Sequence, residues 1–283
     1  MFIMNNLSKV FFILLIVSQS PCFAAPKISA NDLVLFQTAV DSYGEKVYVK
    51  ALNAFQKLAY KNFDIAQYNL GVMYKNGEGS EKDLKKAFYW FEKAANQDNA
   101  TAQSAIGSLY ELGEGTPQDL NKAFFWYKKA ANQGDAESQF RLGYFYLQGT
   151  TVDQDYSAAF FLFKKSAEKE TSGAQFNLAI MYEQGLGVTK DCEQALYWMT
   201  QAATQNEIKA QSKLGMYYQY GICAKEDLQL ALIWLKRAAE KNDAQAQLNL
   251  AVLYLIDRPG FSKDEEQAKF WLKKATEQNP MSQ

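Results

Sequence analysis

Apolar residues recur along most of the chain at the spacing of amphipathic helices. Ala87, Trp90, Phe91 and Ala94 fall at positions i, i+3, i+4 and i+7, which places them on one face of a helix. The segment 70–74 upstream also carries its apolar residues at helical spacing, and mainly polar residues separate the two segments. The pattern therefore predicts two antiparallel helices joined by a short loop.

This helix pair returns six times with a period of 36 residues. The segment that begins Ala-Gln-Tyr-Asn-Leu-Gly has its starts at Ala66, Ala102, Ser138, Ala174, Ala210 and Ala246. A tyrosine follows each start at one offset, at Tyr74, Tyr110, Tyr146, Tyr182, Tyr218 and Tyr254. Self-similarity at a fixed period of this length is typical of repeat proteins, in which each unit packs against its neighbours.

Residues at fixed places in each repeat predict where the helices end and begin. A glycine three residues after most of the tyrosines is placed to adopt the left-handed conformation that ends the first helix. In the second repeat, Thr116 is predicted as the N-cap of the second helix, with Pro117 at the first helical position and Asp119 facing the helix dipole. Ser262 and Glu265 have the spacing of a capping box. The aspartates that recur at the place of Asp119 are interpreted as helix-start residues rather than as a catalytic carboxylate pair.

Neither helix of a pair can bury its apolar stripe alone, so the pairs are expected to stack into an all-α solenoid. Residues 66–283 hold the six regular repeats. Residues 25–65 are predicted as a degenerate capping repeat, because Ala51, Phe55 and Leu58 keep the apolar stripe while the glycine signature is lost. The prediction is seven stacked helix pairs.

The repeat resembles the Sel-1-like repeat family, a relative of the tetratricopeptide repeats. The matching strings are A-Q-Y-N-L-G-V-M-Y-K-N-G-E-G from Ala66 and K-A-F-Y-W-F-E-K-A-A from Lys86, and the resemblance covers about residues 30–277. It implies a right-handed α-solenoid. It also implies a scaffold or adaptor that binds other proteins, although a fold does not by itself fix a function.

Residues 1–24 have the pattern of a secretory signal peptide. Lys9 is the only charged residue, an apolar run follows at 10–17, and small residues surround a cleavage position after Ala24. The run is too short to cross the ~30 Å hydrocarbon core of a bilayer. Two alternatives remain open, a lipid-modified Cys22 and an uncleaved N-terminal anchor. The favoured prediction is an exported chain, periplasmic or secreted, with no stable membrane insertion after cleavage.

Removing the signal leaves two cysteines, Cys192 and Cys223, and one disulfide between them is predicted for an oxidising compartment. Cys192 replaces the apolar residue that Leu84, Leu120 and Leu228 supply at the start of other second helices. Cys223 lies in the loop that follows the first helix of the next repeat, close enough to reach back. The alternative is a pair of isolated thiols.

The amino-acid composition excludes several classes of catalytic and ligand-binding site. The 283 residues include no histidine, which excludes histidine-based triads and His-ligated zinc. With 30 basic and 31 acidic residues the chain has no excess positive charge for a nucleic acid. All five tryptophans share one repeat position, which indicates packing, and no Gly-x-Ser-x-Gly nucleophile-elbow motif is present. The sequence therefore predicts a non-enzymatic protein without a cofactor or metal.

The expected binding site is a groove on the concave face, which the first helix of each pair would line by analogy with tetratricopeptide proteins. Its predicted apolar residues are Val72, Tyr144, Ile180, Met216 and Val252, edged by Glu111 and Glu183. An apolar row edged by a few charges suits a protein or peptide ligand. The alternative is that these residues pack only against neighbouring first helices.

A second functional hypothesis comes from a cysteine-rich secreted branch of the same family, whose members are described as penicillin-binding proteins or weak β-lactamases. In that branch a cysteine pair straddles the turn between consecutive repeats. The chain has Ala95 and Gln103 at those places, and their counterparts also lack cysteine, so it departs from the branch.

Overall fold

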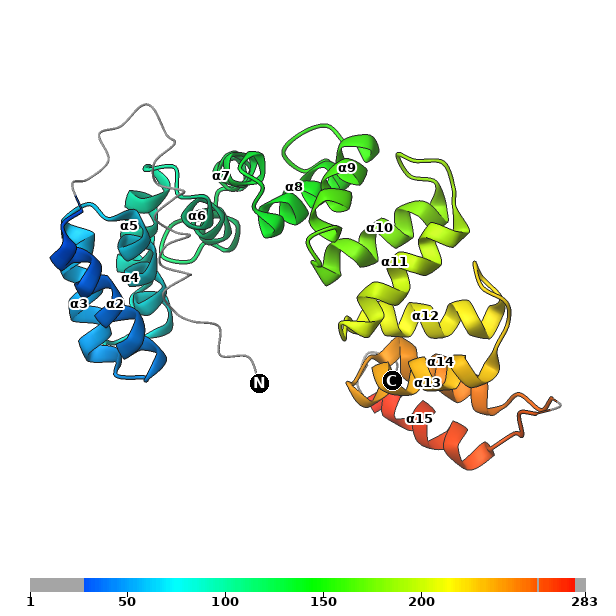
Figure 1. Ribbon diagram of the computed structural model, residues 1–283. Helices are drawn as coiled ribbons and strands as arrows, with labels where there is room; N and C mark the ends of the chain where they lie inside the picture. Colours follow the sequence, from blue (N-terminus) through cyan, green and yellow to red (C-terminus); the bar gives the residue numbers. More distant parts are fainter. Residues whose placement is uncertain (1–27, 259, 278–283) are drawn as a thin grey trace. The chain divides into compact units, whose positions relative to one another are not determined.

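The computed structural model describes residues 28–258 and 260–277, which form fourteen α-helices in seven consecutive pairs (Figure 1). Within these residues the only β-type pairing is an isolated bridge between Arg258 and Phe261. The predicted all-α solenoid of helix pairs is therefore confirmed. The predicted signal peptide, its cleavage position and Cys22 lie outside the described residues.

Each pair consists of a first and a second helix. The first helices are α2 (Ala30–Gly44), α4 (Asp64–Asn76), α6 (Ala100–Leu112), α8 (Ala136–Gln148), α10 (Ser172–Gln184), α12 (Ile208–Tyr220) and α14 (Ala244–Tyr254). The second helices are α3 (Tyr48–Tyr60), α5 (Leu84–Ala95), α7 (Leu120–Asn132), α9 (Tyr156–Ala167), α11 (Cys192–Thr204), α13 (Leu228–Glu240) and α15 (Glu265–Glu277).

The chain divides into two compact units within α6. One unit extends to Ala102 and includes Glu114–Pro117, and the other comprises Gln103–Gly113 and the residues from Gln118 onward. The first unit contains the helix pair α2–α3, in which Ala51, Phe55 and Leu58 are buried as the apolar stripe requires. Its assignment as a degenerate capping repeat stays a prediction.

A glycine in the first helix allows the two helices of a pair to pack closely. A Cβ atom added at Gly143 would lie 2.8 Å from the ring of Phe163 on the second helix, and one at Gly71 would lie 2.7 Å from the ring of Phe91. Real Cβ atoms do not approach that near, so the large side chain packs directly on the glycine backbone. This contact explains the Leu-Gly-x-x-Tyr pattern.

The recurring aspartate is the N-cap of the second helix. In the second repeat α7 begins at Leu120, and the Asp119 carboxylate accepts a hydrogen bond from the Lys122 amide at 3.0 Å. The predicted N-cap Thr116 and helical Pro117 are therefore wrong, since both residues precede the helix. The Ser262 capping box is wrong as well, because α15 begins after Asp264, whose carboxylate accepts from the amides of Glu266 and Gln267.

A backbone hydrogen bond between the recurring tyrosine and the recurring aspartate closes the loop inside each repeat. The backbone amide of Asp119 donates to the carbonyl of Tyr110 at 2.9 Å, which holds the N-cap next to the end of the first helix. The same bond joins Asp83 to Tyr74 and Asp155 to Tyr146. This hydrogen bond between residues nine positions apart decides which residue caps the helix. Capping preferences consider only the residues next to the helix start, so they could not predict it.

A buried glutamine near the start of each first helix ties one repeat to the preceding one. Gln139 donates to the carbonyl of Ala131, eight residues earlier at the end of the preceding second helix. Equivalent bonds are made by Gln67, Gln175, Gln211 and Gln247. Each amide satisfies a carbonyl that the helix end leaves without an intrahelical partner.

Candidate functional site

In several repeats a glycine of the loop rests on the first residue of the preceding second helix, at a place that we call the loop seat. Gly187 has a φ of +66°, and a Cβ added to it would lie 2.3 Å from the carbonyl oxygen of Tyr156. Gly115 contacts Leu84 in the same way, with a corresponding distance of 2.2 Å. Only glycine combines this left-handed conformation with so near an approach to backbone.

A disulfide replaces the glycine contact at the seat between the fourth and fifth repeats. Cys223 stands where other loops have the seat glycine, and Cys192 stands where Leu84 and Tyr156 receive it. The two sulfurs are bonded, with the α-carbons 4.7 Å apart, and Cys223 keeps a positive φ of 54°. This is the pairing predicted from the sequence, at a separation of 31 residues.

The loop seat of the third repeat carries a third residue type, Thr151. Its φ is not in the left-handed region, and its hydroxyl is buried without a hydrogen-bond partner. A side chain at this place cannot approach the backbone of Leu120 as Gly187 approaches Tyr156. The glycine contact of the regular loop seat is therefore absent at Leu120.

A pocket of about 440 Å³ lies at this interruption. Its walls are the largely apolar side chains of Phe140, Tyr144 and Phe145 on α8 together with Leu120 at the start of α7. Its polar lining consists of Glu111, Arg141, Gln148 and Thr150. Apolar walls with a few polar groups are typical of ligand pockets.

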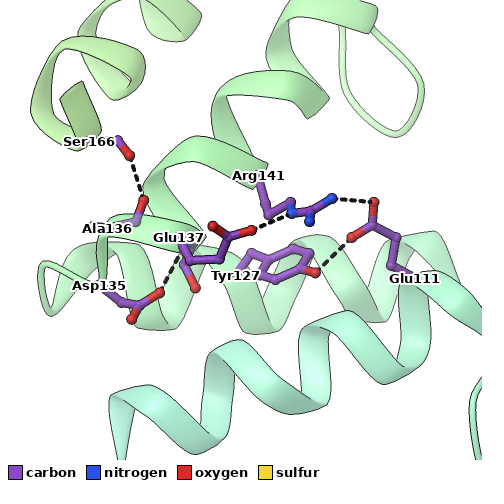
Figure 2. A network of polar contacts seen from close by, with 8 residues as sticks. Glu111, Tyr127, Asp135, Ala136, Glu137, Arg141 and Ser166 are labelled. Carbon is purple, nitrogen blue, oxygen red and sulfur yellow. Dashed lines mark hydrogen bonds and ion pairs between the residues drawn. The ribbon is translucent and has the colours of Figure 1, made fainter. Parts of the chain in front are cut away.

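A polar network fixes the charged edge of the pocket (Figure 2). The hydroxyl of buried Tyr127 donates to Oε2 of Glu111 at 2.7 Å. Arg141 lies with Nη1 3.8 Å from Oε1 of Glu111, and its Nε donates to Glu137 at 2.7 Å. Burial, with the hydrogen bond to Glu111, raises the pKa of Tyr127, so this phenol remains a donor at neutral pH. The network holds Glu111 and Arg141 in place before any ligand binds.

A similar arrangement occurs two repeats later around Glu183, although its tyrosine comes from the first helix of the next repeat rather than from the second helix of the same one. Its carboxylate accepts from the hydroxyl of Tyr217 at 2.9 Å and pairs with Nζ of Lys213 at 3.1 Å. Lys213 occupies the repeat position of Arg141, and Glu183 that of Glu111. Both predicted edge residues are therefore positioned by a buried tyrosine and a basic residue of the next repeat.

Replacing Tyr127 with phenylalanine should lower the free energy of unfolding by about 1–2 kcal/mol, because the partly buried Glu111 carboxylate loses a hydrogen-bond donor. Urea unfolding of Tyr127→Phe measures the change. Tyr156→Phe serves as the control, since Tyr156 is 37% exposed and should lose little. Equal stabilities of the two variants would contradict the role given to the network.

The other predicted groove residues have different surroundings. Ile180 and Met216 are half-buried on α10 and α12, and Ile180 packs against the core around Met199. Val252 on α14 is 49% exposed, whereas Val72 is half-buried on α4 in the other compact unit. The pocket thus brings together two of the seven predicted residues, Tyr144 and Glu111.

Sequence reasoning missed Phe140, Arg141, Leu120 and Thr150 as lining residues. The signal that was available is the interruption of the glycine column at Thr151, which the repeat alignment displays. Its significance follows only from the folded chain, in which the loop glycines contact the first residue of the preceding second helix.

These features define a class, a helical-repeat protein built from consecutive helix pairs, with a pocket beside α8. The chain belongs to the Sel1 repeat family, because the Sel1 repeat profile matches residues 64–99, 100–135, 136–170, 172–207, 208–243 and 244–280. Proteins of this family are commonly protein-interaction scaffolds. A comparison with curated proteins gives no significant match.

Two solved structures resemble the chain over most of its length. One is c5321, a protective antigen of uropathogenic Escherichia coli strains with an SLR fold, at 33% identity and a TM-score of 0.79. The match covers 88% of this chain but only 54% of c5321, so the chain spans about half the length of that antigen. The other is a Sel1 repeat protein from Oxalobacter formigenes, at 32% identity and a TM-score of 0.76, covering 86% of this chain and 100% of that one.

Proposed function

We propose that the chain is an exported, non-enzymatic scaffold that binds a segment of another protein on its first helices, with the pocket beside α8 as the anchor. The observation that carries this proposal is the pocket itself, whose lining includes Tyr144 and Glu111 and which lies beside the loop seat where threonine replaces glycine and no disulfide takes its place. Regular packing would leave no such space there.

The lining of the pocket favours a peptide ligand. Phe140, Tyr144 and Leu120 offer apolar contact to one large side chain, while Glu111 and Arg141 offer an acceptor and a donor beside it. The backbone of a bound peptide has both N–H donors and C=O acceptors beside the anchoring side chain, so it needs both an acceptor and a donor from the pocket. The polar groups are held by Tyr127 and Glu137, so little ordering is required on binding.

Export is supported by the signal pattern of residues 1–24 and by the Cys192–Cys223 disulfide, which is typical of an oxidising compartment. No helix among the described residues has both the length and the apolar character needed to cross a bilayer.

Thr151→Gly tests the proposal, because it restores the glycine of the other loops and should let the loop close onto Leu120. Peptides selected from a displayed random library on the unmodified protein should bind Thr151→Gly at least about tenfold more weakly. Tyr144→Ala should weaken binding similarly, whereas Tyr220→Ala, at an exposed tyrosine of α12, should not. Affinities are measured by fluorescence anisotropy.

Circular dichroism would show that the variants keep their helices. Peptides that bind Thr151→Gly as well as the unmodified protein, or a selection that enriches none, would refute the pocket as anchor.

A further inference from the structure

A second surface lies on the second helices, away from their buried stripes. Directly before the tryptophan position of each repeat stands one large apolar side chain that is 45–55% exposed. These side chains are Tyr89, Phe125, Phe161, Tyr197, Ile233 and Phe270. Isolated exposed apolar residues are ordinary, but from α7 to α15 one stands at the same place in every second helix, and together these form a row.

Basic side chains accompany this row. Four residues after the ring, Lys129 places its Nζ 5.4 Å from the ring centroid of Phe125, and Lys165 lies 4.4 Å from that of Phe161. Lys274 lies 4.9 Å from the ring of Phe270. Each of these three rings thus carries an ammonium group over one face, at the same level on the helix surface.

Charge is unevenly divided between the second helices and the rest of the chain. The seven second helices hold fifteen of the 30 basic residues but only six of the 31 acidic residues. From α7 onward, those acids stand only at helix ends: Glu193, Glu240, Glu265, Glu266 and Glu277. A nearly neutral chain therefore presents a strip of basic and aromatic side chains along the middle of α7, α9 and α15, whereas α11 carries no basic residue.

We propose that the strip formed by Phe125, Phe161, Phe270 and their lysines binds peripherally to membranes that contain anionic phospholipids. Aromatic side chains interleaved with lysines suit the headgroup region, where the rings enter the interface and the ammonium groups meet phosphate. A lipid surface is laterally continuous, so it needs no register matched to the repeats.

A carbohydrate polymer fits the strip less well. Sugars stack on the faces of aromatic rings, but Lys129, Lys165 and Lys274 already lie over those faces. The strip is made by second helices, whereas the peptide pocket is lined chiefly by α8. Membrane binding therefore goes beyond the proposed function, and either can fail without the other.

Vesicle co-sedimentation of the signal-free chain tests the proposal. Vesicles in which about a third of the phosphatidylcholine is replaced by phosphatidylglycerol should bind the protein, and vesicles of phosphatidylcholine alone should not. The triple variant Lys129→Glu, Lys165→Glu and Lys274→Glu should weaken binding by at least about tenfold. Phe125→Gln with Phe161→Gln should weaken it severalfold at unchanged charge.

The matched control is Lys190→Glu, Lys209→Glu and Lys225→Glu, three exposed lysines off the second helices with the same total charge change. It should bind nearly as well as the unmodified protein. The proposal would be overturned if both triple variants lost binding equally, or if the protein did not bind anionic vesicles at low salt. Unchanged binding of the Phe125→Gln, Phe161→Gln variant would also overturn it. Binding to soluble dextran sulfate with none to vesicles would instead identify an anionic polymer.

Discussion

Gly187→Ala is expected to lower the free energy of unfolding by about 3–4 kcal/mol, because the added methyl group meets both a conformational and a steric penalty. The left-handed conformation at φ +66° costs an alanine about 1–2 kcal/mol. The added Cβ would also lie 2.3 Å from the carbonyl oxygen of Tyr156, so the loop or α9 must shift. Forced displacement of packed atoms typically costs about 1–3 kcal/mol more.

Gly221→Ala is the matched control for this prediction. Gly221 has nearly the same φ of +68°, but its nearest neighbour to an added Cβ is 3.7 Å away. This variant should lose only the conformational part, about 1–2 kcal/mol. Urea unfolding of both variants gives the comparison. Similar losses for the two would mean that the loop seat contributes nothing to stability.

Loss of the disulfide is expected to have a comparable effect. In the chain-entropy model, a bridge between residues 31 apart stabilises the folded state by roughly 3–4 kcal/mol. Cys192→Ala with Cys223→Ala should lose about that much. Unfolding of the unmodified protein with and without reductant should show a loss of similar size, and thiol titration of denatured, unreduced protein should find no free thiol in its mature form.

A second double variant separates the bridge from the seat that it replaces. Cys192→Leu with Cys223→Gly restores the residues that Leu84 and Gly115 supply elsewhere. Because glycine accepts the positive φ of position 223 without strain, this variant should be about 1 kcal/mol more stable than the double alanine. If the double alanine is the more stable, position 223 does not reproduce the regular seat.

The periodic part of the molecule could be predicted from sequence because each repeat satisfies the same packing rule. Three features predict the helix pair: the glycine at the position of Gly71, the buried stripe that includes Phe91, and the recurring tyrosine. They return every 36 residues, so each repeat supports the assignment of the others. The disulfide followed from the same register, since Cys192 and Cys223 depart from it at two adjoining places.

Two predictions failed or stayed partial where a contact between distant residues decides the outcome. Thr116 has the local chemistry of an N-cap, but the bond between the Asp119 amide and the Tyr110 carbonyl selects Asp119. The apolar row of the groove suggested one uniform surface. Packing covers part of Ile180, while Tyr144 lines a pocket beside Leu120, at the loop seat where threonine replaces glycine.

The loop seat also bears on how such an array diversifies after duplication. At the loop seat, glycine allows close packing of the loop on the preceding second helix, cysteine forms a disulfide with that helix, and threonine stands beside a pocket. None of the three changes the boundaries of the flanking helices by more than a residue. A duplicated repeat can thus gain a disulfide or a pocket through a substitution at this position, while the neighbouring repeats maintain the fold. The loop seat is therefore a position at which repeats of one chain can diverge in function.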